Sequence, residues 1–158
     1  MAEKSNPRNE LLTFRVRDYM TAEPQTLRVE QSLLEAVLML RRASLRHIPI
    51  MEDGRLVGVL SDRDVARVAP SLLAPLSPDE YNRVFEDTPV GRVMSKNPIS
   101  TTADAPLAEA VGLLYENRLG CLPVLEEGKL IGIITRVDML RALHDLIASP
   151  ASASSSEL

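Results

Sequence analysis

One short pattern occurs twice in the chain, as Gly58-Val-Leu-Ser-Asp-Arg-Asp64 and as Gly132-Ile-Ile-Thr-Arg-Val-Asp138. In each copy an apolar stretch ends at a hydroxyl residue, Ser61 or Thr135, and an aspartate follows three residues later. A hydroxyl there can cap the free N–H groups of a new helix, and the helix dipole stabilises a carboxylate in the first turn. The pattern therefore predicts a strand that passes directly into a helix. Two interpretations of the aspartates stay open: a capping box with Asp in place of Glu, or a carboxylate held at the junction to bind ligand hydroxyls.

The pattern belongs to a longer internal repeat with an offset of 74 residues and no gap. Met20 matches Met94, Asp64 matches Asp138, and 14 of the 48 positions from 18 to 65 are identical to their counterparts. A unit of about fifty residues is marginal alone, so two copies are expected to bury a face against each other. The sequence therefore predicts one body of two pseudo-symmetric halves, with a cleft along the pseudo-twofold axis.

Each unit has the pattern strand, helix, strand, strand, helix, which predicts an α/β (α+β) fold of two β-α-β-β-α motifs. Ser32-Leu-Leu-Glu35 is a capping box that starts a helix, and Glu52-Asp-Gly54 marks a hairpin turn. Because proline cannot donate to a ladder, Pro49 predicts that its strand lies at or begins at a sheet edge. The expected boundaries are a flexible arm at 1–13, a first motif at 14–69, a Pro-rich connector with a short helix at 70–89, a second motif at 90–146 and a disordered tail at 147–158.

Composition narrows the class of protein. The formal net charge of −4 gives no general attraction to nucleic acid or to an anionic membrane. Cys121 is the only cysteine, so an intramolecular disulfide is excluded and a reducing compartment is expected. The polar N-terminus carries no secretory signal, and no apolar run has the length of a membrane span. These features predict a soluble cytoplasmic protein.

The repeated unit resembles the cystathionine β-synthase (CBS) domain. The residues that carry the resemblance are Val16-Arg-Asp-Tyr-Met-Thr21, Val90-Gly-Arg-Val-Met-Ser95, Arg46-His-Ile-Pro-Ile50, Gly120-Cys-Leu-Pro-Val124 and the two strand-to-Asp patterns. Each motif alone is weak, but their order, spacing and duplication are specific. The resemblance covers residues 14–143 and implies a tandem CBS pair, often called a Bateman module, whose halves pack through their sheets and leave two related clefts.

The resemblance also implies a function. CBS pairs commonly bind adenosine-type ligands, such as AMP, ADP, ATP or S-adenosylmethionine, and often form homodimers. They regulate an attached or partner protein. Since this chain contains no effector domain, we expect a stand-alone sensor that requires no cofactor, binds an adenosine-type regulatory ligand and signals to an effector protein that the sequence does not identify.

Within that interpretation the paired carboxylates gain a chemical role. A ribose presents two adjacent hydroxyls, and the carboxylate of Asp64 or Asp138 can accept hydrogen bonds from both. Ser61 and Thr135 can each add a hydroxyl contact. The helix N-terminus behind each carboxylate offers N–H groups that attract phosphate.

Cations for a phosphate lie inside the two patterns. Arg63 and Arg136 carry planar guanidinium groups that suit phosphate oxygens, although each taken singly is better explained as a solvated surface side chain. Arg63 comes one residue before its aspartate and Arg136 two residues before. This difference predicts unequal affinity at the two sites.

By resemblance, the adenine slot lies between the first strand and the proline-bearing strand of each unit. Its residues are Thr26, His47, Ile48 and Pro49 in one unit, and Ser100, Cys121, Leu122 and Pro123 in the other. The resemblance further implies sites built across both repeats, with Asp138 near His47 and Ile48, a pairing that the sequence leaves open. Ile48 and Leu122 are equally well explained as core residues, His47 as a structural histidine and Cys121 as a buried inert thiol.

Other functions find less support. No Cys/His cluster has the spacing of a metal site, and no glycine-rich phosphate loop, nucleophile elbow or kinase signature occurs. We therefore expect no enzymatic activity. The main alternative is a ligand-free dimerisation or interaction scaffold in which the aspartates are caps only. Binding to nucleic acid is disfavoured by the negative charge, and no membrane association is expected.

Overall fold

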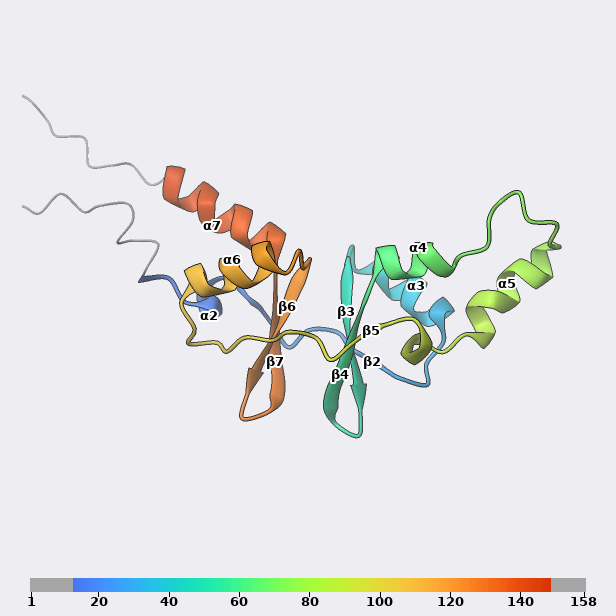
Figure 1. Ribbon diagram of the computed structural model, residues 1–158, viewed down its shortest axis with the longest axis horizontal. Coiled ribbons are helices and arrows are strands. Elements are labelled where there is room, and N and C mark those ends of the chain that lie inside the picture. The colour runs from blue at the N-terminus through green and yellow to red at the C-terminus, as the bar shows by residue number, and fades with distance from the viewer. Residues whose placement is uncertain (1–12, 149–158) are drawn as a thin grey trace, which may run out of the picture.

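The computed structural model describes residues 13–148, in which two sheets face each other and helices cover the outer side of each (Figure 1). Expectations for residues 1–12 and 149–158 lie outside the described residues. The predicted α+β fold of two pseudo-symmetric halves is confirmed, because each half contains a small sheet and its own buried apolar cluster.

The first half is built on a four-stranded sheet of order β2-β3-β4-β5. Its strands are β2 (Leu27–Arg28), β3 (His47–Glu52), β4 (Arg55–Ser61) and β5 (Ser95–Lys96). Its helices are α3 (Leu33–Arg42), α4 (Asp62–Val68) and the connector helix α5 (Pro78–Asp87). In this half α5 packs against α3 on the outer side (Figure 1).

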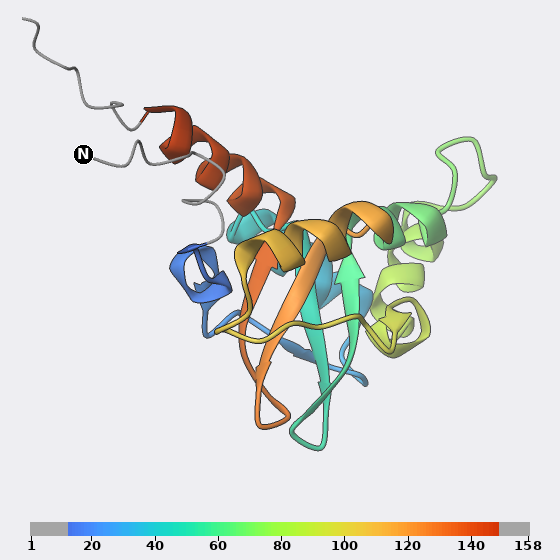
Figure 2. The ribbon, with the colours of Figure 1, turned by 60° about the vertical axis from the view of Figure 1, so that its left-hand side comes forward.

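The second half repeats the plan on a three-stranded sheet of order β1-β7-β6. Its strands are β1 (Thr21–Ala22), β6 (Cys121–Glu126) and β7 (Lys129–Thr135). Its helices are α2 (Val16–Tyr19), α6 (Leu107–Glu116) and α7 (Arg136–Ala148), and the 3-10 turn η1 (Val90–Arg92) precedes β5. Both hairpin turns point to one end of the molecule, and α4 and α7 begin at the other (Figure 2).

The opening segments of the two units are exchanged. β1 pairs antiparallel with β7, with Thr21 opposite Ile133, and β5 pairs with β4, with Ser95 opposite Val59. Val16 and Tyr19 of α2 are buried in the cluster of the second half, whereas Val90 of η1 is buried in that of the first. Each half is therefore completed by the segment that precedes the other half in the sequence.

Two glycines make this exchange possible. A Cβ on Gly132 would lie 2.8 Å from the sulfur of Met20 and 3.1 Å from the carbonyl oxygen of Thr21. Gly58, 74 residues earlier, stands in the same relation to Met94 and to the backbone of Ser95. Only a residue without a side chain lets the exchanged strand approach this closely.

The predicted hairpin turn and the predicted capping box at Ser32 are both present. β3 and β4 are joined by Asp53 and Gly54, both with positive φ, and Glu127 and Gly128 repeat this turn between β6 and β7. Positive φ at both central residues matches the twist of a two-residue hairpin. The Ser32 capping box is also confirmed, because the Ser32 hydroxyl accepts from the N–H of Glu35 and the Glu35 carboxylate accepts from the N–H of Ser32.

Of the two predicted positions for the strand that contains Pro49, an edge strand is wrong, because β3 lies between β2 and β4. A strand that begins at an edge is confirmed, because β2 pairs with β3 only from Ile50. The Met51 carbonyl accepts from Val29 N–H at 3.1 Å, so Met51 and, two residues earlier, Pro49 direct their backbone toward the β2 side. The missing N–H of Pro49 therefore falls beyond the end of the ladder between β2 and β3, where its absence breaks no hydrogen bond.

Candidate functional site

Asp64 is buried at the start of α4, with only 7% of its surface exposed. Its Oδ2 atom accepts from the Ser61 N–H at 2.9 Å and from the Ser61 hydroxyl at 2.7 Å, and the Ser61 hydroxyl oxygen accepts from the Asp64 N–H at 3.2 Å. The predicted capping geometry is therefore present. Oδ1 is engaged only by an ion pair, at 3.5 Å from Nη1 of Arg67.

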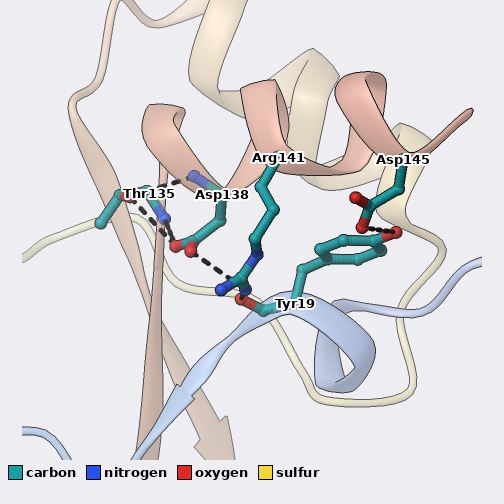
Figure 3. Close-up of polar contacts among 5 residues, drawn as sticks. All are labelled: Tyr19, Thr135, Asp138, Arg141 and Asp145. Atoms are coloured by element: carbon teal, nitrogen blue, oxygen red, sulfur yellow. Dashed lines mark hydrogen bonds and ion pairs between the residues drawn. The ribbon is translucent and has the colours of Figure 1, made fainter. Parts of the chain in front are cut away.

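Asp138 repeats this geometry at the start of α7, with 9% of its surface exposed. Its Oδ2 atom accepts from the Thr135 N–H at 2.8 Å and from the Thr135 hydroxyl at 3.0 Å (Figure 3). Oδ1 lies 3.3 Å from Nη2 of Arg141. In both halves one carboxylate oxygen is thus committed to the cap, and the second is paired with an arginine whose side chain is more than half exposed.

Arg67 and Arg141 are neighbours of the candidate carboxylates that the sequence analysis did not single out. Both lie three residues after their aspartate, and they are identical at the offset of 74. Extending the repeat comparison by two residues beyond position 65 would have found them, and charges at i and i+3 on a helix are neighbours.

His47 of the first half lies against the second half. A Cβ built on Gly120 would stand inside van der Waals contact with Nε2 of His47, so the imidazole lies directly against the backbone of the second half. Burial lowers the pKa of His47; Asp62 and Asp64 partly offset this effect, whereas Arg136 and Arg63 add to it. The imidazole therefore lies among charges of both α4 and α7.

The adjacent strand residues divide between two faces of their sheets. Ile48 and Leu122 are fully buried in the cores of the first and second halves. Their side chains pack toward the helices, which leaves only their backbone for a ligand. Pro49 and Pro123 are also fully buried. The side chains of Ile48 and Leu122 are therefore core residues, as one of the two interpretations predicts.

Cys121 helps to hold the halves together. It forms a small buried cluster with Val59 and Ile133, which come from β4 and β7. Burial raises the pKa of its thiol to about 12, so the thiolate that would act as a nucleophile is scarce at neutral pH. The buried thiol expected from the sequence is what the structure contains.

The two candidate phosphate-binding arginines differ in their freedom. Nε of Arg136 donates to the Leu119 carbonyl at 2.6 Å, and Arg136 N–H donates to the Gly120 carbonyl at 3.2 Å. The Arg63 side chain is exposed and forms no hydrogen bond or ion pair with the residues described. Arg63 and Arg136, whose different positions in the two patterns predict unequal affinity, therefore also differ in their contacts.

The candidate first-strand residues, Thr26 and Ser100, lie beside the proline-bearing strands β3 and β6. Thr26 is exposed and immediately precedes β2, and Ser100, its counterpart, is partly exposed. The next residue, Thr101, is buried and bridges β6, where its N–H donates to the Pro123 carbonyl at 3.0 Å. Thr26 and Ser100 therefore flank the proline-bearing strands at the ends of the parallel pairings.

Two open grooves lie elsewhere on the surface. One, of about 460 Å³, is lined by Gln25, Glu35, Leu38, Met39, Arg42 and Ala43. The other, of about 360 Å³, is lined by Val29, Glu52, Val57, Gly91, Met94, Lys96 and Asn97. Neither groove includes a predicted nucleotide-binding residue.

Of the helices within residues 13–148, none combines the length and the apolar character that crossing a bilayer requires. Over the same residues, no group of three or more His, Cys, Asp or Glu side chains is placed to hold a metal ion.

Comparison with known proteins gives consistent matches along the chain. The family model for the CBS domain matches residues 16–71 and 90–145. A CBS domain-containing protein of Dictyostelium discoideum is 30% identical over 130 residues, which cover 81% of this chain and 90% of that protein. The CBS domain-containing protein YhcV of Bacillus subtilis (strain 168) is 30% identical over 124 residues, which cover 78% of this chain and 81% of YhcV.

A solved structure with the same architecture contains a nucleotide. The crystal structure of CBSX2 in complex with AMP superposes with a TM-score of 0.71 at 28% identity. The alignment covers 85% of this chain and 99% of that one.

Proposed function

The chain belongs to the CBS domain family, and we propose that it is a regulatory module that binds an adenosine-type ligand between its two halves and signals to a partner protein. AMP is the first candidate, because CBSX2, 28% identical, was crystallised with AMP. ADP, ATP and S-adenosylmethionine belong to the same chemical class and are tested beside it.

The observation that carries this proposal is the duplicated carboxylate. Asp64 and Asp138 are each buried at a helix N-terminus, and each keeps one oxygen outside the capping box. Ribose hydroxyls can donate to that oxygen, since an ionised carboxylate accepts several hydrogen bonds. Burying a carboxylate costs free energy, and an exposed carboxylate is enough to form a capping box, as Ser77 and Glu80 do on α5. The burial of Asp64 and Asp138 therefore favours a role beyond capping.

The remaining ligand groups have candidate partners beside the carboxylates. We propose that the adenine edge contacts the backbone of 47–49 or 121–123, flanked by Thr26 or Ser100. The phosphate would contact Arg63 at the first site and Arg136 at the second. Since Arg136 is already tied to the Leu119 carbonyl and Arg63 is free of such a bond among the described residues, the first site should hold the phosphate more tightly.

Isothermal titration calorimetry of the full chain with AMP, ADP, ATP and S-adenosylmethionine tests the proposal. We expect binding that Asp64→Asn and Asp138→Asn each weaken at one site. Glu80→Gln is the matched control, because it alters a capping box of the same type far from both carboxylates. Lack of binding by all four compounds at millimolar concentration would refute the proposal.

A second candidate is a ligand-free scaffold, favoured by the fact that Oδ2 of both aspartates is fully used in capping. On that reading Asp64→Asn and Asp138→Asn lower stability as Glu80→Gln does, and no nucleotide binds. The same titration therefore separates the two candidates.

We also propose that the chain forms a homodimer through its second half. Six large apolar side chains are exposed on α6 and α7: Val111, Tyr115, Val137, Leu140, Leu143 and Ile147. On α7 the last three follow at helical spacing and so share one face. In the first half α5 packs against α3, whereas no described helix has that role against α6 among the main contacts. A second copy of this chain would cover this face.

A further inference from the structure

The polar contacts of Asp138 extend into another part of the chain. Nη2 of Arg141, which pairs with Oδ1 of Asp138, also donates to the carbonyl oxygen of Tyr19 at 2.6 Å (Figure 3). Its guanidinium carbon lies 5.5 Å from the centroid of the Tyr19 ring, within the range of a cation–π contact. One arginine thus joins the candidate ligand carboxylate to α2, and we refer to Asp138, Arg141 and Tyr19 as the Arg141 bridge.

Tyr19 is itself firmly placed. Its ring is buried in the core of the second half and meets Phe14 edge-on, with centroids 5.5 Å apart. Its hydroxyl donates to Oδ2 of Asp145, one turn beyond Arg141 on α7, at 3.2 Å (Figure 3). α7 therefore holds α2 at two points, and the Arg141 bridge supplies the one nearer to Asp138.

The first half does not contain this bridge. Arg67 pairs with Asp64 at the longer distance of 3.5 Å, and its side chain is 75% exposed against 55% for Arg141. At the offset of 74, Tyr19 corresponds to Val93 and Asp145 to Ser71, so ring and carboxylate are both missing. α4 also ends at Val68, before a second contact could form.

We propose that Arg141 is a positioning residue that competes with the ligand for Oδ1 of Asp138, so that occupation of this site loosens α2. The inference rests on the proposed function. A ribose hydroxyl that donates to Oδ1 displaces the guanidinium of Arg141 from that oxygen. The guanidinium then keeps its contacts with Tyr19 but is no longer held by Asp138. Occupation of the Asp64 site has no such path to an exchanged segment. The second site is therefore the one that reports to the rest of the chain.

Hydrogen exchange of the full chain, read at α2, tests this proposal together with AMP titration. The amides to follow are those of Val16, Arg17 and Met20, which donate to Ala105, Ala103 and Val16 at 2.9 to 3.0 Å. We expect AMP to speed their exchange in the wild-type chain. In Arg141→Gln they should exchange fast without ligand, and AMP should add nothing. In Arg67→Gln, the matched control, they should respond to AMP as in the wild type.

Affinity supplies a readout that a merely structural arginine would not change in this direction. Removing the competitor in Arg141→Gln should raise the affinity of the Asp138 site for AMP by roughly five-fold, the scale of a partly exposed ion pair, even though the fold loses a contact. Arg141→Lys restores a charge beside Oδ1 and should return the affinity to the wild-type range. Binding of AMP to Arg141→Gln but not to the wild type would also support competition.

The opposing outcomes are distinct. If AMP binds the wild type and α2 exchange does not change, or if Arg141→Gln weakens AMP binding, the role of Arg141 is refuted while the proposed function stands. If neither the wild type nor Arg141→Gln binds any of the four adenosine compounds, the proposed function fails and this inference with it.

Discussion

The imidazole of His47 packs directly against the backbone of Gly120, which belongs to the other half of the molecule. Gly120 does not adopt a positive φ, so glycine is needed there for space and not for conformation. The Gly120 carbonyl accepts from the N–H of Arg136 at 3.2 Å. One close contact therefore connects a residue of the first proposed site with the start of α7.

Gly120→Ala should lower the free energy of unfolding by about 1–3 kcal/mol, the usual cost of overpacking, because the new methyl group displaces the half-buried imidazole. Urea unfolding measures the change. The control is Gly112→Ala, since a Cβ there meets nothing within 4 Å and alanine favours the helix interior. Equal stability of the two variants would contradict tight packing of His47 against Gly120.

Stability should fall on acidification from pH 7.5 toward pH 5, and His47 should account for part of the fall. Its folded-state pKa is below the ordinary value of 6.5, so in that window the unfolded chain binds more protons and the free energy of unfolding rises with pH. His47→Gln should flatten this slope in urea titrations at several pH values. An unchanged slope in His47→Gln would contradict this role of His47.

Gly132→Ala should loosen the exchanged strand β1 and lower stability by about 1–3 kcal/mol, because the methyl group would press on Met20 and on the backbone of Thr21. The expected sign in hydrogen exchange is faster exchange at Thr21 and Ala22. Gly112→Ala again serves as control. Unchanged exchange at β1 would mean that Met20 can move aside without moving its strand.

Leu140→Asp should convert the proposed dimer into monomer, because it places a charge in the exposed apolar face of α7. Sedimentation velocity measures the mass. Leu73→Asp is the matched control: Leu73 is 94% exposed on the connector loop and outside that face. A dimer that persists in Leu140→Asp, or a wild-type chain that is monomeric, would count against this interface.

Features with local causes could be predicted from the sequence. The Ser61–Asp64 and Thr135–Asp138 boxes and the Asp53-Gly54 turn depend on residues within four positions of one another. The repeat offset identified which residues are equivalent, and with the family resemblance it gave the fold. Burial of Ile48 and Leu122 was left open, because strand alternation alone does not say which face meets the helices.

The exchange of the opening segments could not be predicted in the same way. Met20 and Met94 are equivalent by offset. An internal repeat is compatible with two arrangements: each opening segment can pack on its own half or on the other half. The pairing of β1 with β7 and of β5 with β4 distinguishes the two arrangements, together with the close approach of Met20 to Gly132 and of Met94 to Gly58. Likewise, the Tyr19–Arg141 contact joins residues 122 positions apart, and no local pattern indicates it.

The exchanged segments also bear on the order in which the protein can be made. Residues 27–68 leave the ribosome before Val90 and β5, yet they need Val90 in their core and β5 on their sheet. The first half to be synthesised is therefore completed only when the second has begun, and the newborn chain carries an open sheet edge until then. A chain released at residue 77 should be digested by protease in β3 and β4 faster than one released at residue 97.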